Sequence, residues 1–145
     1  MEENDANQTR IVDAGGAEAV VTAMRQHADV ADVQEEACVA LGSMLTNNAR
    51  NQTRIGDAGG IEALVAAMQR HADTIRVQKW ACIALATLFN VNAANETRIC
   101  AAGGIEAVVA AIQRLADAGD EWAVEKLLRV EPTLHRAGVL APREP

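Results

Sequence analysis

Apolar positions recur along the chain at the spacing of buried helix faces. Ile61, Leu64, Val65 and Met68 follow the i, i+3, i+4, i+7 spacing of one helical stripe. Short pairs of Val and Ile occur, but none extends into an alternating apolar and polar run bounded by hairpin turns. Many of the residues between these positions are Ala, Glu, Gln and Arg, which favour helix. The pattern predicts an all-helical protein.

The same pattern occurs three times. The stretch "NQTRIGDAGGIEALVAAMQRHAD" at residues 51–73 has near copies at 7–29 and 95–117, spaced 44 residues apart. The first full period and the second share 25 identical residues in 44. A segment copied at a fixed period of this size is typical of stacked repeats. We therefore expect one domain over residues 1–145, with repeats at about 7–50, 51–94 and 95–138.

Each repeat predicts three helices. Asn51 can cap a short first helix, which the glycines of "AGG" at 58–60 end, because glycine adopts the left-handed conformation that helix ends often need. A second helix covers about residues 61–71. The third, with Asp73 as its N-cap, extends to about residue 90.

The predicted third helices have one face that barely changes between repeats and one that varies. The shared face is centred on Leu41 and Leu85 and also contains Gln34, Ala37, Cys38, Met44, Leu45, Gln78, Ala81, Cys82, Leu88 and Phe89. The divergent face contains Glu35, Glu36, Val39, Ser43 and Thr46 in the first repeat, and Lys79, Trp80, Ile83, Thr87 and Asn90 in the second. In a stack of repeats, shared residues make the contacts between repeats and divergent ones face solvent or a partner.

These features resemble armadillo repeats. The resemblance rests on the period, "DAGGI" at a sharp corner, a second helix ending in "AMQRH", and a third beginning "VQ" and containing "ACIALATL". It implies a right-handed α-solenoid of three-helix repeats whose third helices line a concave surface. Many members of the family hold an extended peptide or a partner's helix there. The predicted partner-binding site is therefore the divergent face without Thr46, nine residues in all: Glu35, Glu36, Val39, Ser43, Lys79, Trp80, Ile83, Thr87 and Asn90.

The resemblance also argues against one kind of ligand. Peptide-binding members of the importin type carry a tryptophan in each third helix, followed four residues later by an asparagine that bonds the ligand backbone. The corresponding pairs here are Val39 with Ser43 and Ile83 with Thr87. We expect an apolar row flanked by small hydroxyls, and no binding of nuclear-localisation signals of that type.

The two ends of the repeat array differ. After Asp117 the third copy departs from the pattern, and we expect a C-terminal capping helix that ends the array by design. Its apolar stripe would contain Ala123, Val124, Leu127, Leu128 and Val130.

At the other end, "MEENDA" is too short to supply a covering helix. We therefore expect the first repeat to be partly bare around Val12, Val20 and Met24, and to self-associate as a homodimer or end to end.

Composition excludes several partners. The net charge of -7 and the isoelectric point near 4.9 oppose binding to nucleic acid or anionic lipid, and no cluster of Lys and Arg offsets them. Apolar runs fall far short of the ~20 residues of a membrane span, and the acidic N-terminus is unlike a secretory signal. We expect a cytoplasmic protein, with the nucleus as an alternative.

The three cysteines predict structural thiols. Cys38 and Cys82 occupy equivalent sites in two repeats, about 10 Å apart. That separation exceeds the ~7 Å Cα limit for a disulfide. Cys100 occupies the site of Val12 and Gly56, and a metal site would need more ligands at ligand spacing. We expect no metal and no cofactor.

Two further motifs have a chemical interpretation and a structural one, and we favour the structural one. Asn7, Asn51 and Asn95 begin Asn-x-Thr sequons but also stand where the short helices need caps. The glycine pairs precede helices that could bind phosphate, yet no strand precedes them and no "GK[ST]" follows.

Polar side chains inside the predicted helices also favour structural roles. His27 and His71 share a site that Leu115 fills in the third copy, which is unlike a catalytic base. Gln34 and Gln78 lie on the inner side of their helices, where we expect their amides to bond loop carbonyls of an adjacent repeat.

Two features of the third helices leave the choice more open. Trp80 is either a binding hot spot or packs sideways against Trp122. Glu35 and Glu36 could attract a basic ligand, but acidic residues at a solvated helix start are also favoured by the helix dipole.

The sequence therefore predicts a protein-interaction module or scaffold. The alternative is a structural or self-assembling repeat unit, natural or idealised by engineering, whose working surface is the first repeat. An enzyme is the weakest interpretation, because no Ser/His/Asp set, Cys/His set or paired carboxylate site is evident.

Overall fold

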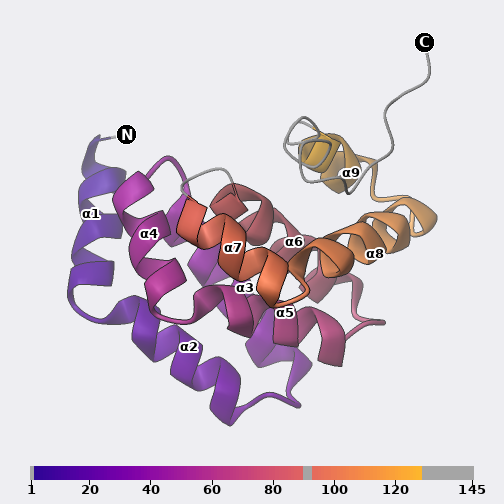
Figure 1. Ribbon diagram of the computed structural model, residues 1–145, viewed down its shortest axis with the longest axis horizontal. Helices are drawn as coiled ribbons and strands as arrows, with labels where there is room; N and C mark the ends of the chain where they lie inside the picture. Colours follow the sequence, from indigo (N-terminus) through magenta and orange to yellow (C-terminus); the bar gives the residue numbers. More distant parts are fainter. Residues whose placement is uncertain (1, 90–92, 129–145) are drawn as a thin grey trace.

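The computed structural model describes residues 2–89 and 93–128, and every regular element in those ranges is a helix (Figure 1). Repeat one contains α1 (Glu2–Asp13), α2 (Gly16–Gln26) and α3 (Ala31–Leu45). Repeat two contains α4 (Ala49–Asp57), α5 (Gly60–Arg70) and α6 (Ile75–Phe89). Repeat three contains α7 (Ala93–Ala101), α8 (Gly104–Asp117) and α9 (Glu121–Leu128). The predicted all-helical stack of three-helix repeats is confirmed.

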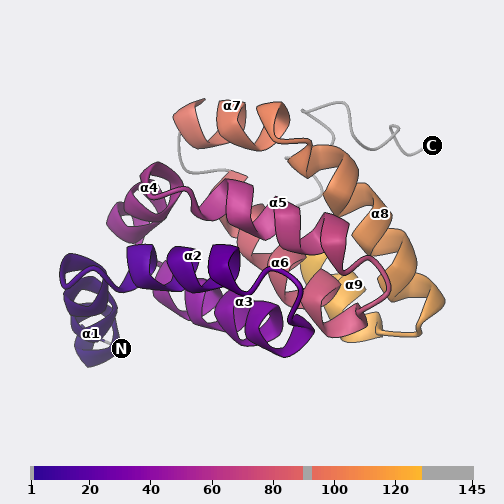
Figure 2. The same cartoon turned by 90° about the horizontal axis from the view of Figure 1, so that it is seen from below.

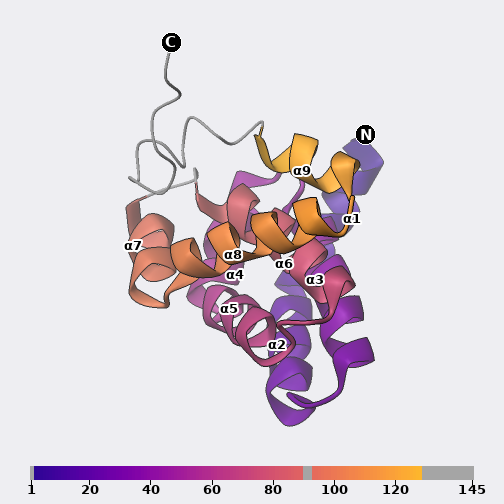
Figure 3. The same ribbon diagram turned by 90° about the vertical axis from the view of Figure 1, so that its right-hand side faces the viewer.

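The repeats stack so that equivalent helices follow one another. Figure 2 shows α2, α5 and α8 in succession, with the short helices α1, α4 and α7 at one end of each. The most extensive contact between repeats is that of α3 with α6, and α6 also packs against α8 and α9 (Figure 3). The third helices therefore form one side of the stack, and α9 takes the place of a third helix in repeat three.

A left-handed glycine makes each corner between the first and second helices, as predicted. Gly15, Gly59 and Gly103 have φ values of 89°, 89° and 77°. Each stands immediately before α2, α5 or α8. Because L-residues with a Cβ rarely adopt this conformation, glycine at these three positions sets the angle between the helices.

The shared face of the third helices is the core of the molecule. Leu41 and Leu85 are buried, together with all the other residues predicted for that face: Gln34, Ala37, Cys38, Met44, Leu45, Gln78, Ala81, Cys82, Leu88 and Phe89. The two helices pack along each other, so these side chains close the space between repeats.

The buried glutamines bind within their own repeat, so the prediction of a partner in an adjacent repeat is wrong. The side-chain amide of Gln34 donates to the carbonyls of Met24 and His27, at 3.1 and 2.9 Å. Gln78 does the same to Met68 and His71, at 2.9 and 3.0 Å. The last carbonyls of a helix have no partner inside it, and the glutamines satisfy these at the ends of α2 and α5.

The sequon asparagines do not cap the first helices, which corrects the prediction. The side chain of Asn48 caps α4 by accepting from the Asn51 backbone amide at 3.1 Å. Asn51 and Asn95 are buried, and their amides donate to the carbonyls of Met44 and Gln52, at 2.9 and 3.1 Å. Both therefore join a first helix to the preceding repeat, and Asn7 is exposed within α1.

One small residue makes room for this contact between repeats two and three. A Cβ added to Gly56 would overlap the Oδ1 atom of buried Asn95. In repeat one Val12 occupies the equivalent site, and there Asn51 bonds the Met44 carbonyl instead. The absence of a side chain at Gly56 therefore leaves the space that the Asn95 amide occupies.

Replacement of Gly56 by alanine tests this close contact. We expect Gly56→Ala to lower the free energy of unfolding by about 1–3 kcal/mol, because the new methyl group displaces a buried, hydrogen-bonded amide. Gly42→Ala is the matched control, since Gly42 lies inside α3 and an added Cβ there meets nothing within 4 Å. It should raise stability by about 0.4–1 kcal/mol. Urea unfolding followed by circular dichroism measures both, and equal effects would contradict the packing described.

Candidate partner-binding groove

The third helices line a hollow that draws on all three repeats. Its volume is about 450 Å³. Its lining consists of Cys38, Val39, Gly42, Ser43, Thr46 and Asn47 at α3, Gln52 of α4, Trp80, Ile83 and Thr87 of α6, and Lys126 of α9. We call this hollow the groove.

The groove brings together five of the nine residues predicted to bind a partner: Val39, Ser43, Trp80, Ile83 and Thr87. Of the other four, Glu35, Glu36 and Lys79 do not line it, and Asn90 lies outside the described residues.

Two of those four are held in ion pairs outside the groove. Glu35 accepts from Arg76 at 2.8 Å, and Lys79 pairs with Asp120 at 3.1 Å. Glu36 is exposed. Because Glu35 already has a cationic partner, it is poorly placed to attract a basic ligand.

The hydroxyl groups of the groove are turned toward their own helices. Ser43, Thr46 and Thr87 each donate to the carbonyl four residues earlier, at 3.0, 2.9 and 2.9 Å. A hydroxyl has one proton and two lone pairs. With the proton in use, these groups can accept further hydrogen bonds but have none to donate.

Both tryptophans and both lysines of the chain meet at the α9 end of the groove. The rings of Trp80 and Trp122 pack edge to face with centroids 6.0 Å apart. Lys79 Nζ lies 4.7 Å from the Trp122 ring centroid, and Lys126 Nζ lies 5.0 Å from it. The structure therefore shows the lateral packing that was one interpretation of Trp80, and Trp80 also contributes to the groove wall.

Asp120 fastens the start of α9 to α6. Its side chain accepts from the Ala123 backbone amide at 3.0 Å and pairs with Lys79. The hydrogen bond from Ala123 has the largest effect and lowers the pKa of Asp120; burial opposes it, and the hydrogen bond and charge of Lys79 lower the pKa further. The carboxylate is therefore the form that holds α9 in place. Ala123 and Leu127 are buried beneath the helix, as predicted for the cap, while Val130 lies outside the described residues.

Sequence reasoning missed Lys126 and Asn47 as parts of the groove. Lys126 was hidden because α8 extends to Asp117, so α9 does not keep the 44-residue register. Asn47 follows α3 with a φ of 54°, a left-handed conformation that asparagine tolerates better than most residues. Asparagine directly after a helical pattern was the available signal.

The expected bare patch on repeat one has a different composition. Val12 and Met24 are buried and Val20 is half-buried, so the prediction of a bare surface at these residues is wrong for the first two. They belong to the core that α1, α2 and the neighbouring helices share. Ile11 is the large apolar side chain that α1 exposes. Self-association through this end stays a prediction.

The cysteines divide into two buried thiols and one exposed thiol. Cys38 and Cys82 are buried and Cys100 is exposed, and none of the three forms a disulfide. Burial raises the pKa of Cys38 and of Cys82 to about 12, and Glu35 adds to the shift at Cys38. Within the described ranges, no group of three or more His, Cys, Asp or Glu residues is placed to hold a metal ion.

A family comparison agrees with this architecture. The family model described as "LRRK2 ARM repeat" matches residues 1–129. The chain belongs to this armadillo repeat family. Searches of curated proteins and of solved structures gave no match. Armadillo repeat domains are in general non-enzymatic scaffolds, so the chain is a protein-interaction repeat module.

Among the described residues of this armadillo domain, no single helix has the length and hydropathy to cross a membrane. The pair α7 and α8 has them only when the two helices are taken together, and they are bent by 74° relative to each other.

Replacement of Asp120 tests the attachment of α9. We expect Asp120→Ala to lower the free energy of unfolding by about 1 kcal/mol at pH 7, because a helix cap and an ion pair are lost together. A lowered carboxyl pKa stabilises the fold above the unfolded value near 4, and that contribution disappears as the pH falls through the folded pKa. The difference between the variant and the natural chain should therefore vanish in acid.

Urea unfolding followed by tryptophan fluorescence measures this difference, because Trp122 lies on α9. Asp117→Ala is the matched control: Asp117 is exposed, and among the described residues its side chain accepts from Gln113 on its own helix. A loss as large in the control, or a loss for Asp120→Ala that persists in acid, would contradict the assigned role.

The thiols give a second test. A maleimide at pH 7.5 should label one cysteine per folded chain, Cys100, and three after denaturation, because the thiolate is the reactive form and burial suppresses it. Mass spectrometry of the labelled chain gives the count. Rapid labelling of Cys82 in the folded chain would show that α6 is not buried between its neighbours.

Proposed function

We propose that this armadillo domain binds a segment of a partner protein, either an extended peptide or a helix, in the groove formed by α3, α6 and α9. The observation that supports it is the composition of the groove, in which Val39 and Ile83 form an apolar row between the hydroxyls of Ser43, Thr46 and Thr87. A small site with apolar walls and a few convergent polar groups is the usual form of a binding pocket.

The polar groups of the groove favour a ligand that brings hydrogen-bond donors. The three hydroxyls have already donated their protons to helix carbonyls. Their free lone pairs can accept the backbone amides of an extended segment or the donor side chains of a helix. An importin-type asparagine would instead offer both a donor and an acceptor, so this groove selects differently from that class.

The charge of the groove favours an acidic residue on the ligand. Lys126 is the charged residue among those that line it, and it stands at the end where α9 meets α6. Lys79, close by, is already paired with Asp120. We therefore expect ligands with an apolar side chain for the Val39 and Ile83 row and a carboxylate near Lys126.

Selection from a displayed peptide library, followed by titration of a labelled synthetic peptide, tests the proposal. Ile83→Asp should weaken binding at least about tenfold, because a charge replaces the apolar contact that buries the ligand. Lys126→Glu should weaken the binding of acidic peptides and leave neutral ones nearly unchanged. Fluorescence polarisation measures both affinities, and the tryptophans beside the groove supply an independent signal.

Val109→Asp is the matched control. Val109 is exposed on α8 and does not line the groove, so the same apolar-to-acidic change there should leave binding unchanged. Circular dichroism shows that each variant keeps its helices. If Val109→Asp abolishes binding and Ile83→Asp does not, the groove is not the binding site.

A further inference from the structure

The first repeat exposes an isoleucine that the other repeats bury. Ile11 is 50% exposed, whereas its equivalents, Ile55 and Ile99, are 0% and 1% exposed. Each of the three lies against the second glycine of its own corner in the same way. The neighbour that differs is the preceding repeat, since α4 packs against α1 and α2, and α7 packs against α4 and α5. Ile11 therefore occupies the position that the preceding repeat covers in repeats two and three.

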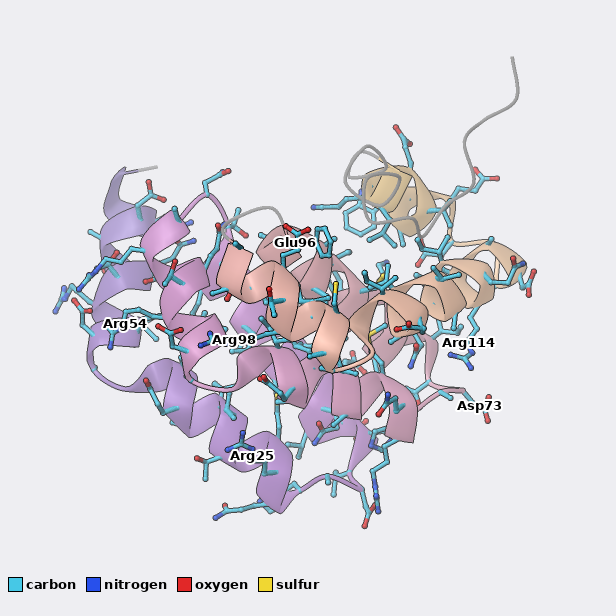
Figure 4. All side chains as sticks on the ribbon, viewed as in Figure 1. Arg25, Arg54, Asp73, Glu96, Arg98 and Arg114 are labelled. Carbon is cyan, nitrogen blue, oxygen red and sulfur yellow. The ribbon has the colours of Figure 1, made fainter. Side chains whose placement is uncertain are left out.

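An arginine on each first helix also differs in its contacts between repeat one and the other two repeats. Arg54 pairs with Asp13, and Arg98 pairs with Asp57 at 2.7 Å. Each pair joins a first helix to the end of the first helix in the preceding repeat, and Figure 4 labels Arg54 on α4 and Arg98 on α7. Arg10 is the equivalent in α1, where it is exposed and forms no ion pair within the described part of the chain.

Three more positions follow the same rule. Asn7 is exposed, but Asn51 and Asn95 are buried and bond carbonyls of the preceding repeat. His27 is exposed, but the ring of His71 donates to the Ala28 carbonyl of the preceding repeat at 2.7 Å.

Val20 is half-buried where Leu64 and Val108 are buried. We call the set Asn7, Arg10, Ile11, Val20 and His27 the front surface.

The front surface is not built as a cap. Terminal repeats of a solenoid need a polar outer face, yet this one keeps two apolar side chains together with the arginine, asparagine and histidine that make the internal contacts. The internal contacts also show the matching chemistry: an aspartate at the end of a first helix, and a carbonyl just after a second helix that accepts from the histidine.

We propose that the front surface docks a partner protein through an armadillo-type repeat whose first helix ends in an aspartate. The aspartate pairs with Arg10, and a carbonyl at the end of the partner's second helix accepts from His27. Apolar side chains of the same repeat cover Ile11 and Val20, as repeats one and two cover Ile55 and Ile99.

A second copy of this chain fits the front surface less well. In repeat three, Ala101 stands where Asp13 and Asp57 occur in the first two repeats. A copy stacked head to tail would therefore leave Arg10 without a carboxylate. A copy stacked front to front would place two identical front surfaces against each other. Both contacts inside the chain instead join the front of one repeat to the back of the repeat before it. The front surface is thus suited to another protein.

A tethered repeat of known chemistry tests the docking. A copy of residues 51–94 is inserted between Ala6 and Asn7, which reproduces the junction sequence at 93–95 and presents a second Asp57 to Arg10. The covalent link gives the inserted repeat a high effective concentration, so a front surface that can dock a repeat will bind it. We expect one unfolding transition in urea, with a higher midpoint and a steeper slope than the natural chain, because the slope follows the surface buried.

Ile11→Asp is made in both chains. It should change the midpoint of the natural chain little, because the side chain is half exposed there, and should separate the extended chain into two transitions. Arg10→Asp should lower the midpoint of the extended chain, and Asp57→Arg in the inserted copy should restore it. An extended chain that unfolds at the natural midpoint, or that is indifferent to Ile11→Asp, would overturn the proposal.

Sedimentation equilibrium of the natural chain decides whether the occupant is a second copy. We expect a monomer over the concentration range tested. A homodimer that Ile11→Asp dissociates would overturn the assignment to another protein and would support self-association through the same surface.

Discussion

Burial between neighbouring repeats is the constraint on which the structure depends. A single repeat cannot cover the apolar face of its own third helix, so it gains a core only when the next repeat lies against it. α6 shows this most clearly, because it packs against α3 on one side and against α8 and α9 on the other. The residues left outside this packing are those that can contact other molecules. The groove and the front surface are therefore the parts of the repeats that neighbouring repeats leave uncovered.

Polar groups inside the stack set its register. Asn51 and Asn95 carry a hydrogen bond from each first helix to the preceding repeat, and Gln34 and Gln78 close the ends of the second helices. Buried polar groups without partners are costly, so a repeat that slipped along its neighbour would lose these bonds. The exposed ion pairs between first helices add little stability, but they report the same register.

The features that repeat along the chain could be predicted from the sequence. Which of several nearby groups a polar side chain bonds could not. Three copies at one spacing were enough to place the helices, the glycine corners and the buried face around Leu41 and Leu85. The cap of α4 was misplaced because Asn48 and Asn51 are both good caps, and only the packing of Asn51 against the preceding repeat decides between them. The same limit applied to Gln78, whose amide could reach carbonyls in its own repeat or the next. Lys126 was missed since a longer α8 shifts the register of α9, which no internal copy reveals.

Native-state hydrogen exchange of the natural chain tests the dependence of each repeat on its neighbours most directly. Amides in α5 and α6, which have a repeat on each side, should exchange most slowly, and those in α1 and α9 should exchange fastest because their helices are covered on one side. Exchange as slow in α1 as in α6 would show that the repeats do not need one another for shelter, and would contradict the account.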